Sequence, residues 1–208
     1  MRTPRFFACL LLPLLLCLAL RAFSEDFAVF PDRKELHSPD GKYVIRSIER
    51  TPQPGEFVGV FRALVLEEAA THKTRVLCGY LGRAAVAWSG DTYIIVTDYV
   101  GKRTSRALVF SVDQNANGFV VDKNDLERRV SGSFSEKLRG NEHVFIEALK
   151  VQSGKLDLRV WGYGTHDPRG FRLFCNIELD LGNATCGEAT ERSNEPAGDH
   201  QRTVTQKN

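Results

Sequence analysis

Short catalytic motifs are missing from this chain of 208 residues. It contains no G-x-S-x-G nucleophile elbow, no H-E-x-x-H helix and no Gly-rich phosphate-binding loop. The local signatures of hydrolases, zinc proteases and nucleotide-binding proteins are therefore absent. A triad built from residues far apart in sequence is recognised by its geometry and leaves no such signature. The sequence alone thus specifies no reaction.

Long apolar runs are also scarce, and the one at the N-terminus is the clearest. Residues 6–20 (FFACLLLPLLLCLAL) follow Arg2 and Arg5 and precede a small-x-small sequence at 22–24, which is the layout of a secretory signal peptide. The run of fifteen residues is shorter than the roughly 20 needed to cross a bilayer. We therefore expect residues 1–24 to be removed as a signal peptide. The chain is then exported to a periplasmic or secreted location and keeps no membrane span.

Without this leader, neither sign of charge is in excess and cysteines are few. Three of the 28 Lys and Arg residues lie in the leader, so 25 basic residues face 26 acidic ones in the remaining 184. This balance gives no support for a nucleic-acid or anionic-membrane partner. Cys78, Cys175 and Cys186 remain. Three cysteines are too few, and odd in number, to form a disulfide framework, and their spacing matches no zinc site.

Most of the sequence between 25 and 182 is typical of short strands separated by turns. Runs rich in Val, Ile, Leu, Phe and Tyr alternate with Gly, Asp, Asn and Pro, which predicts an all-β fold. The predicted strands are 43–49, 58–67, 74–78, 84–88, 92–98, 106–112, 118–121, 143–151, 155–161 and 171–181.

The last two predicted strands alternate most clearly. Leu, Val, Phe, Ile or Cys occupies every second position of 155–161 and 171–181, which predicts half-buried antiparallel strands. Cys175 falls on the apolar face, where a cysteine usually behaves as a small inert hydrophobe. This placement argues against a disulfide with Cys186, although connectivity is not readable from sequence.

Two short segments are predicted to form helical turns. Asn124 is a candidate N-cap for 125–129, and Ser133 with Glu136 fits a capping box for 134–139. Neither segment has an apolar stripe long enough for an independent helix.

The C-terminal segment lacks large apolar side chains. In residues 183–208 the only large aliphatic residue is Val204. Such a segment buries too little apolar surface to offset its ordering entropy, so we expect a disordered tail.

Three sets of strands look like copies of one unit. SPDGKYVI at 38–45 is echoed by WSGDTYII at 88–95, with Tyr43 and Tyr93 separated by 50 positions, and more faintly by KVQSGKL at 150–156. Repeats of roughly 40–50 residues with about four strands each are typical of propeller blades.

The motifs at 38–44 (SPDGKYV) and 87–91 (AWSGD) resemble the W-S-P-D-G-type turn of TolB-like β-propeller repeats, which joins the first two strands of a blade. The resemblance covers 38–182, and the chain also resembles small secreted bacterial proteins of unknown function. It implies blade-like antiparallel sheets and assigns no active site to the motif. Three units are fewer than the roughly four to eight that close a ring. We therefore expect an all-β domain at 25–182 with three propeller-blade-like repeats, arranged as an incomplete propeller or a compact sandwich.

The best candidate for ligand contact is the loop at 161–170 (WGYGTHDPRG). Its aromatic side chains are suited to stacking on a sugar or a peptide and its guanidinium to pairing with an anion. The alternative is a glycine-rich hairpin loop whose aromatics cover the sheet edge. The candidate ligand-binding residues are Trp161, Tyr163, His166, Asp167 and Arg169.

A second candidate is a calcium loop. Residues 113–118 (DQNANG) fit D-x-N-x-N-G, with Asp113, Asn115 and Asn117 as the oxygen donors. Asn124 replaces the bidentate Glu expected at the twelfth position, so calcium binding would be weak. The favoured interpretation is an Asn-Gly hairpin connection between two strands, with no cofactor.

These observations favour a non-enzymatic exported module that contacts a protein or an envelope component. The alternative is a secreted hydrolase or carbohydrate-binding protein that uses the 161–170 loop, with His166, Asp167 and Arg169 in one pocket. The basic run at 102–106 is interpreted as a solvated hairpin tip, because the chain has no net positive charge without its leader.

Overall fold

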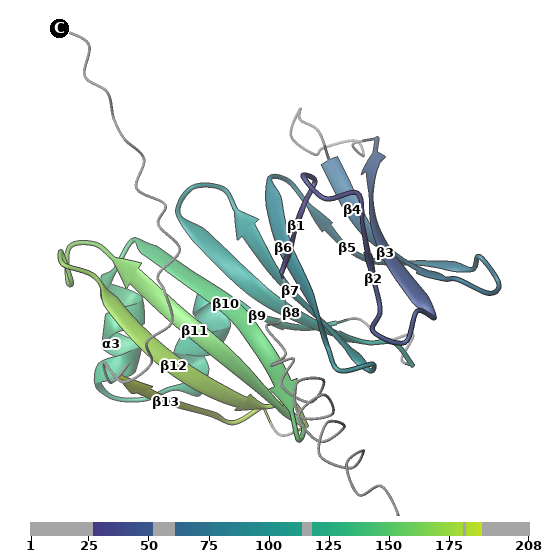
Figure 1. Ribbon diagram of the computed structural model, residues 1–208. Coiled ribbons are helices and arrows are strands. Elements are labelled where there is room, and N and C mark those ends of the chain that lie inside the picture. The colour runs from purple at the N-terminus through teal and green to yellow at the C-terminus, as the bar shows by residue number, and fades with distance from the viewer. Residues whose placement is uncertain (1–26, 52–60, 114–117, 181, 189–208) are drawn as a thin grey trace, which may run out of the picture.

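The computed structural model describes residues 27–51, 61–113, 118–180 and 182–188 (Figure 1). These residues form thirteen strands and two short helices, so the expected all-β class is confirmed. The strands are β1 (Ala28–Phe30), β2 (Glu35–His37), β3 (Tyr43–Arg50), β4 (Phe61–Glu68), β5 (Thr74–Tyr80), β6 (Arg83–Ser89), β7 (Tyr93–Val100), β8 (Thr104–Ser111), β9 (Phe119–Val121), β10 (His143–Gln152), β11 (Lys155–Tyr163), β12 (Phe171–Glu178) and β13 (Ala184–Glu188). The helices are α2 (Lys123–Arg129) and α3 (Ser133–Gly140).

The described strands form two sheets, and neither closes into a ring. Strands β2, β3, β4 and β5 make a four-stranded antiparallel sheet. The other nine strands follow the order β1-β6-β7-β8-β10-β11-β12-β13, with β9 paired to β8. Strands β8 and β10 are parallel and meet at a single residue pair, Thr104 and Val144. The β6–β9 and β10–β13 parts of this sheet diverge from that point (Figure 1).

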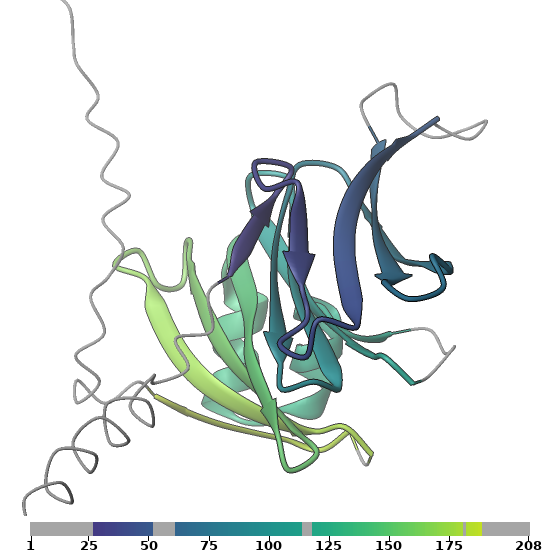
Figure 2. The ribbon, with the colours of Figure 1, turned by 45° about the vertical axis from the view of Figure 1, so that its right-hand side comes forward.

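Strands β6–β8 are the middle of three layers, because both of their faces are buried. One face packs against the four-stranded sheet in a cluster that includes Leu64 and Val96. The other packs against β10–β12 and both helices, in a cluster that includes Ile95, Leu138 and Leu158. A strand buried on both faces carries a continuous apolar run, and β7 (YIIVTDYV) begins with one. Figure 2 shows the three layers side by side.

Strand β10 pairs with β11 along one backbone edge. Its other edge faces the middle layer, which β10 crosses. Side-chain hydroxyls of β6, β7 and β8 take the place of a neighbouring strand and bond this edge. All three hydroxyl-bearing residues are at most 5% exposed, so water does not substitute for them. The pairs are Ser105 Oγ with the N–H and C=O of Ile146 (2.8 and 2.9 Å), Thr97 Oγ1 with the N–H of Ala148 (3.0 Å), and Ser89 Oγ with the N–H and C=O of Val151 (2.7 and 3.0 Å).

Both helices form near the predicted positions, but their caps differ from the prediction. Asp122, and not Asn124, caps α2, because its Oδ1 accepts the N–H of Asp125 at 2.7 Å. Helix α3 follows Gly132 and has no side-chain cap. The predicted capping box is therefore wrong, since Ser133 is already the first residue of the helix.

The C-terminal boundary of the domain is a second correction. Strand β13 pairs with β12 at the end of the sheet, so ordered structure continues to Glu188 and the expected tail does not begin at 183. Cys175 and Cys186 stand opposite each other on these strands and form a disulfide, with 4.1 Å between their Cα atoms. Cys175 does lie on the apolar face, at 1% exposure. The inference against the bridge fails because β13 brings Cys186 to the same face.

Several predicted features lie outside the described residues. They are the signal peptide at 1–24, most of the predicted tail (189–208), and the candidate calcium ligands Asn115 and Asn117. Among the residues that the structure does describe, no helix has the length and apolar character to span a membrane.

Replacing Thr97 with valine tests the hydroxyl contacts of β10. The Thr97→Val variant keeps the size of the side chain and leaves the buried N–H of Ala148 without its acceptor. We expect the free energy of unfolding, measured by urea denaturation, to fall by about 1–3 kcal/mol. Thr92→Val, at an exposed turn position, is the matched control and should change it by less than about 0.5 kcal/mol. Equal effects of the two variants would contradict the role assigned to Thr97.

The disulfide is expected to contribute measurably to stability. Its cysteines are separated by 11 positions, and the loop-closure model gives about 3 kcal/mol for a ring of that size. Dithiothreitol should therefore lower the melting temperature of the protein and leave that of the Cys186→Ser variant unchanged. An unaltered melting temperature in a sample whose thiol titration shows full reduction would rule this contribution out.

Candidate functional site

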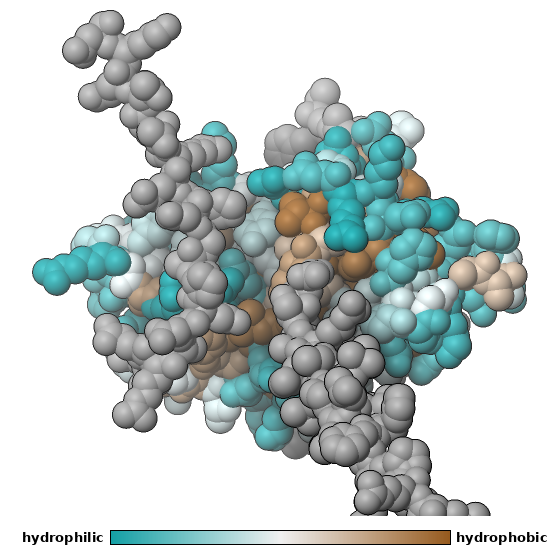
Figure 3. Space-filling model, in the orientation of Figure 1, coloured by the Kyte–Doolittle hydropathy of each residue, from teal (hydrophilic) through white to brown (hydrophobic). Residues whose placement is uncertain are grey.

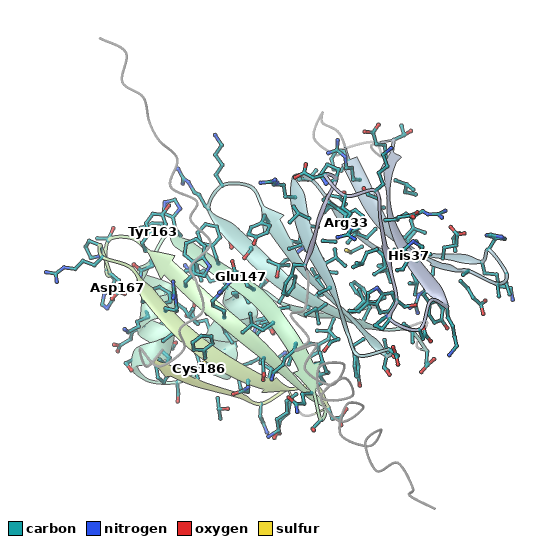
Figure 4. The ribbon with its side chains drawn as sticks, in the orientation of Figure 1. Arg33, His37, Glu147, Tyr163, Asp167 and Cys186 are labelled. Atoms are coloured by element: carbon teal, nitrogen blue, oxygen red, sulfur yellow. A yellow bond between two sulfur atoms is a disulfide. The ribbon has the colours of Figure 1, made fainter. Side chains whose placement is uncertain are left out.

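The loop at 164–170 joins β11 to β12 and is folded around Asp167. The C=O of Asp167 accepts the N–H groups of Gly164 (3.4 Å) and Gly170 (2.9 Å). Tyr163 and Asp167 lie at the same end of the sheet (Figure 4). The backbone of Asp167 therefore sets the shape of the loop.

The side chain of Asp167 is bound to Asn141, which follows α3. Asn141 Nδ2 donates to Asp167 Oδ2 at 2.8 Å, and the N–H of Asp167 donates to Asn141 Oδ1 at 3.0 Å. Asn141 is 1% exposed and its Nδ2 also donates to the C=O of Lys137 at 2.8 Å. Asp167 thus ties the loop to α3, which is a positioning role.

The neighbouring loop residues also face the end of α3. His166 packs against Gly140, where any Cβ would overlap the His166 side chain, so the close approach requires glycine. Glu142 accepts hydrogen bonds from the N–H (2.9 Å) and Oγ1 (2.6 Å) of Thr165. These bonds hold the pKa of the Glu142 carboxyl below its usual range, because they favour the charged form.

The other predicted loop residues line an open hollow of about 480 Å³. Trp161, Tyr163 and Arg169 belong to it, together with Arg172 of β12. The five predicted residues therefore divide into two groups. Three border the hollow, whereas His166 and Asp167 make structural contacts with α3 and the residue after it. Of the three residues predicted to share one pocket, only Arg169 lines the hollow, and His166 and Asp167 do not.

The hollow continues onto the outer face of β10–β12, which carries aromatic and arginine side chains. Two cross-strand pairs are stacked, His143 on Tyr163 with 4.4 Å between ring centroids and Phe145 on Trp161 with 4.1 Å. In Figure 3 both hydrophobic and hydrophilic residues reach the surface over β11 and β12. We call this surface the aromatic–arginine face; its cross-strand rows are His143 and Tyr163, then Phe145, Trp161 and Arg172, then Glu147, Arg159 and Phe174.

Glu147 links this face to the middle layer. Its Oε2 accepts from Arg159 Nε at 2.6 Å, and the Tyr99 hydroxyl of β7 donates to its Oε1 at 3.5 Å. Burial, together with the nearby Glu147 carboxylate, raises the pKa of Tyr99 to about 12. Tyr99 therefore keeps its proton for this bond at neutral pH. On this face Tyr163 is 43% and Phe174 38% exposed, and Arg172 is exposed as well, whereas Phe145 is only 9% exposed.

The candidate calcium segment connects paired strands. Strands β8 and β9 follow each other in sequence and pair antiparallel, with Val109 opposite Phe119. Asp113 is exposed. Gly118 is required by the ring of Phe110, which occupies the space of any Cβ there. Within the described part of the chain, no group of three or more His, Cys, Asp or Glu is placed to hold a metal ion.

Sequence reasoning missed a buried ion pair in the basic run at 102–106. Arg106 donates from Nε (2.9 Å) and Nη2 (2.8 Å) to Asp98 Oδ2 on the neighbouring strand. Asp98 is 2% exposed, and its burial raises the pKa of its carboxyl. The available signal was an acid interrupting the apolar run of β7, eight residues before a basic residue across a tight turn. Antiparallel pairing across such a turn places the two side chains opposite each other.

Cys78 is a free thiol near this ion pair. Burial raises its pKa to about 12, and the Asp98 carboxylate adds to the effect. The thiolate is the nucleophilic form of cysteine, and the raised pKa disfavours it at Cys78, whose side chain packs partly buried against the core beside the four-stranded sheet.

No protein-family model, curated protein or solved structure matches this chain. Comparison with known proteins therefore assigns it to no family and leaves the TolB-like resemblance as an expectation. Its function has to be argued from the geometry of the site.

Removing Asn141 should loosen the loop. The Asn141→Ala variant loses both side-chain bonds to Asp167, and hydrogen exchange of the Asp167 and Gly170 amides should accelerate. The loss of a buried, fully bonded amide should lower the free energy of unfolding by about 1–3 kcal/mol. Asn176→Ala, which removes an exposed amide bonded to Asp157, is the control and should cost less than about 0.5 kcal/mol. Unchanged exchange rates in Asn141→Ala would show that the loop is held by other contacts.

Proposed function

We propose that the chain is an exported, non-enzymatic β-rich module that binds a protein or envelope component through the aromatic–arginine face. Export rests on the leader-like residues at 1–24. Binding rests on the composition and position of the outer face of β10–β12. The loop at 164–170, tied to α3 through Asp167, serves as the rim of that face.

The observation that carries this proposal is the two stacked aromatic pairs beside Arg172. Phe145 stacks on Trp161 and His143 stacks on Tyr163 across strands β10 and β11, and Arg172 lies opposite Trp161 on the next strand. Trp, Tyr, Phe and Arg are the residues enriched at the centres of protein interfaces. Their rigid rings also lose little conformational entropy when a partner binds.

The arrangement of the sheets supports the same surface. We interpret β2–β5, β6–β9 and β10–β13 as three blade-like units stacked in sequence order, consistent with the motifs at 38–44 and 87–91. In such a stack every blade covers the one before it. The outer face of the third unit is the one that a following blade would cover, so a partner takes the place of that blade.

Carbohydrate binding by the hollow is a second candidate. Trp161 and Tyr163 border an open space of about 480 Å³ beside Arg169, and aromatic rings with a nearby polar group suit a sugar. A hydrolase is less well supported, because His166 and Asp167 are engaged with Gly140 and Asn141.

A double variant on the face tests the proposal. Tyr163→Ala/Phe174→Ala removes two exposed rings and should reduce retention of a component from solubilised envelope about tenfold or more. Val76→Ala, which removes a 63% exposed side chain on the other sheet, is the matched control and should bind like the unaltered protein. A photo-crosslinking amino acid at position 174, but not at 76, should join the protein to the same component.

The chemistry of the retained component separates the two candidates. A protease-sensitive component supports the protein partner, whereas a protease-resistant, periodate-sensitive one identifies the carbohydrate alternative. Equal retention by the double variant and the control, with no crosslink from position 174, would remove the face as a binding surface.

A further inference from the structure

The hollow beside the 164–170 loop carries two arginine side chains and no acidic one. Arg169 and Arg172 line it together with Trp161 and Tyr163, and no acidic residue of the described chain contributes to its lining. Both arginines are exposed. The hollow therefore has a local positive charge next to aromatic rings, although the chain without its leader has no net positive charge.

Neither of these arginines uses its guanidinium within the described chain. The side chains of Arg169 and Arg172 have no hydrogen-bond or ion-pair partner among the residues that the structure describes. Most other described arginines do pair with a carboxylate, as Arg159 pairs with Glu147 at 2.6 Å on the same face. A guanidinium binds a carboxylate through two parallel hydrogen bonds. Two such groups on one hollow are thus available to an anion from outside the chain.

The acidic residues nearest to the loop are bonded elsewhere. Asp167 Oδ2 accepts a hydrogen bond from Asn141 Nδ2 at 2.8 Å. Glu142 accepts hydrogen bonds from the N–H and the hydroxyl of Thr165 at 2.9 and 2.6 Å. Because these bonds hold both carboxylates in place and neither residue lines the hollow, neither one pairs with its arginines.

The aromatic side chains add an apolar contact beside the positive charge. Trp161 is stacked on Phe145 and Tyr163 on His143, so the two rings are ordered before a ligand arrives. Tyr163 is 43% exposed, and a ligand that covers it removes apolar surface from water. An anion that also carries an apolar group therefore suits the hollow better than a small inorganic anion.

We propose that the hollow binds an acidic segment of a partner protein, with carboxylates on Arg169 and Arg172 and an apolar side chain against Trp161 and Tyr163. This inference rests on the proposed function of the aromatic–arginine face and specifies the chemistry of its partner. An anionic lipid surface suits the hollow less well, because lipid-binding clusters hold roughly four to eight Lys or Arg residues. A nucleic acid is also disfavoured, because its binding depends on many phosphate contacts.

The test uses the peptide Ac-Asp-Glu-Phe-Asp-Glu-NH2 as the probe and Ac-Asn-Gln-Phe-Asn-Gln-NH2 as its neutral analogue, at pH 7 and low salt. In a titration followed by ¹H–¹⁵N NMR, the acidic peptide should saturably shift the indole N–H of Trp161 and the amides of Gly164 and Gly170. The buried indole N–H of Trp88 should not move. The neutral peptide should bind about tenfold more weakly, because it lacks the charge-assisted hydrogen bonds to both guanidiniums. Added salt should weaken only the acidic peptide.

Two double variants with the same change in net charge separate a local site from general attraction. Arg169→Gln/Arg172→Gln should weaken binding of the acidic peptide about fivefold or more, because two ion pairs are lost. Arg33→Gln/Arg103→Gln is the matched control and should keep the affinity within about twofold. Its two arginines are also exposed and have no side-chain partner among the described residues, but they do not line the hollow. Arg33 lies far from Tyr163 in Figure 4.

Retention of the envelope component separates this inference from the proposed function. Arg169→Gln/Arg172→Gln should reduce retention, as Tyr163→Ala/Phe174→Ala does. If the aromatic variant lost the component while the arginine variant kept it, the face would bind its partner without an acidic segment, and only this inference would be overturned. Equal affinity for the two peptides, or equal affinity of the two arginine variants for the acidic peptide, would overturn it as well. So would binding of phosphatidylglycerol vesicles in place of the acidic peptide.

Discussion

Strand β10 carries its unpaired backbone edge across the middle layer, and three buried hydroxyls of that layer bond it. A buried N–H or C=O without a partner costs about as much as a lost hydrogen bond, so this edge has few permitted positions. Ser105, Thr97 and Ser89 lie on successive strands and mark a diagonal. Because β8 and β10 share only one residue pair, the diagonal of hydroxyls, and not a continuous backbone ladder, sets the course of β10. The position of the whole β10–β13 unit follows from it.

Because β10 crosses the middle layer in this position, one face of the β10–β12 unit is buried and the other is exposed. The inner face closes over the middle layer and both helices in a core that includes Ile146 and Leu173. The outer face has no further sheet over it among the described strands. Its aromatic side chains stack on one another instead, as Phe145 does on Trp161, and its acid and arginine pair within the sheet. The proposed binding surface is therefore a consequence of the same constraint that positions β10.

The opposite face of the middle layer packs differently. Its interface with the four-stranded sheet is apolar near Leu64 and Ile94 but contains the Asp98–Arg106 pair toward the other end of the strands. Arg106 satisfies one carboxylate oxygen and leaves the other without a partner in the described chain. The two interfaces of the middle layer thus differ in whether their buried polar groups have hydrogen-bond partners. Next to β10 the hydroxyls of Ser89, Thr97 and Ser105 are bonded to backbone groups, whereas Asp98 Oδ1 is buried without a hydrogen-bond partner among the described residues.

The sequence by itself determined the all-β class and most strand positions, because a period of two and the turn residues between apolar runs are local properties. It also identified Trp161, Tyr163 and Arg169 as neighbours on one connection. The cap at Asp122 is a local contact, three residues from its partner, that sequence reasoning assigned to the wrong residue. Only the tertiary structure decided which residues meet across strands. The Cys175–Cys186 bridge, the placement of β13 and the Asp98–Arg106 pair depend on strand register, which local pattern does not encode. The same holds for His166 and Asp167, whose side chains are directed by Gly140 and Asn141 at the end of a helix that is distant in sequence. Local sequence pattern therefore predicted the strands and the loop, whereas packing between segments that are distant in sequence decided which partners the side chains contact.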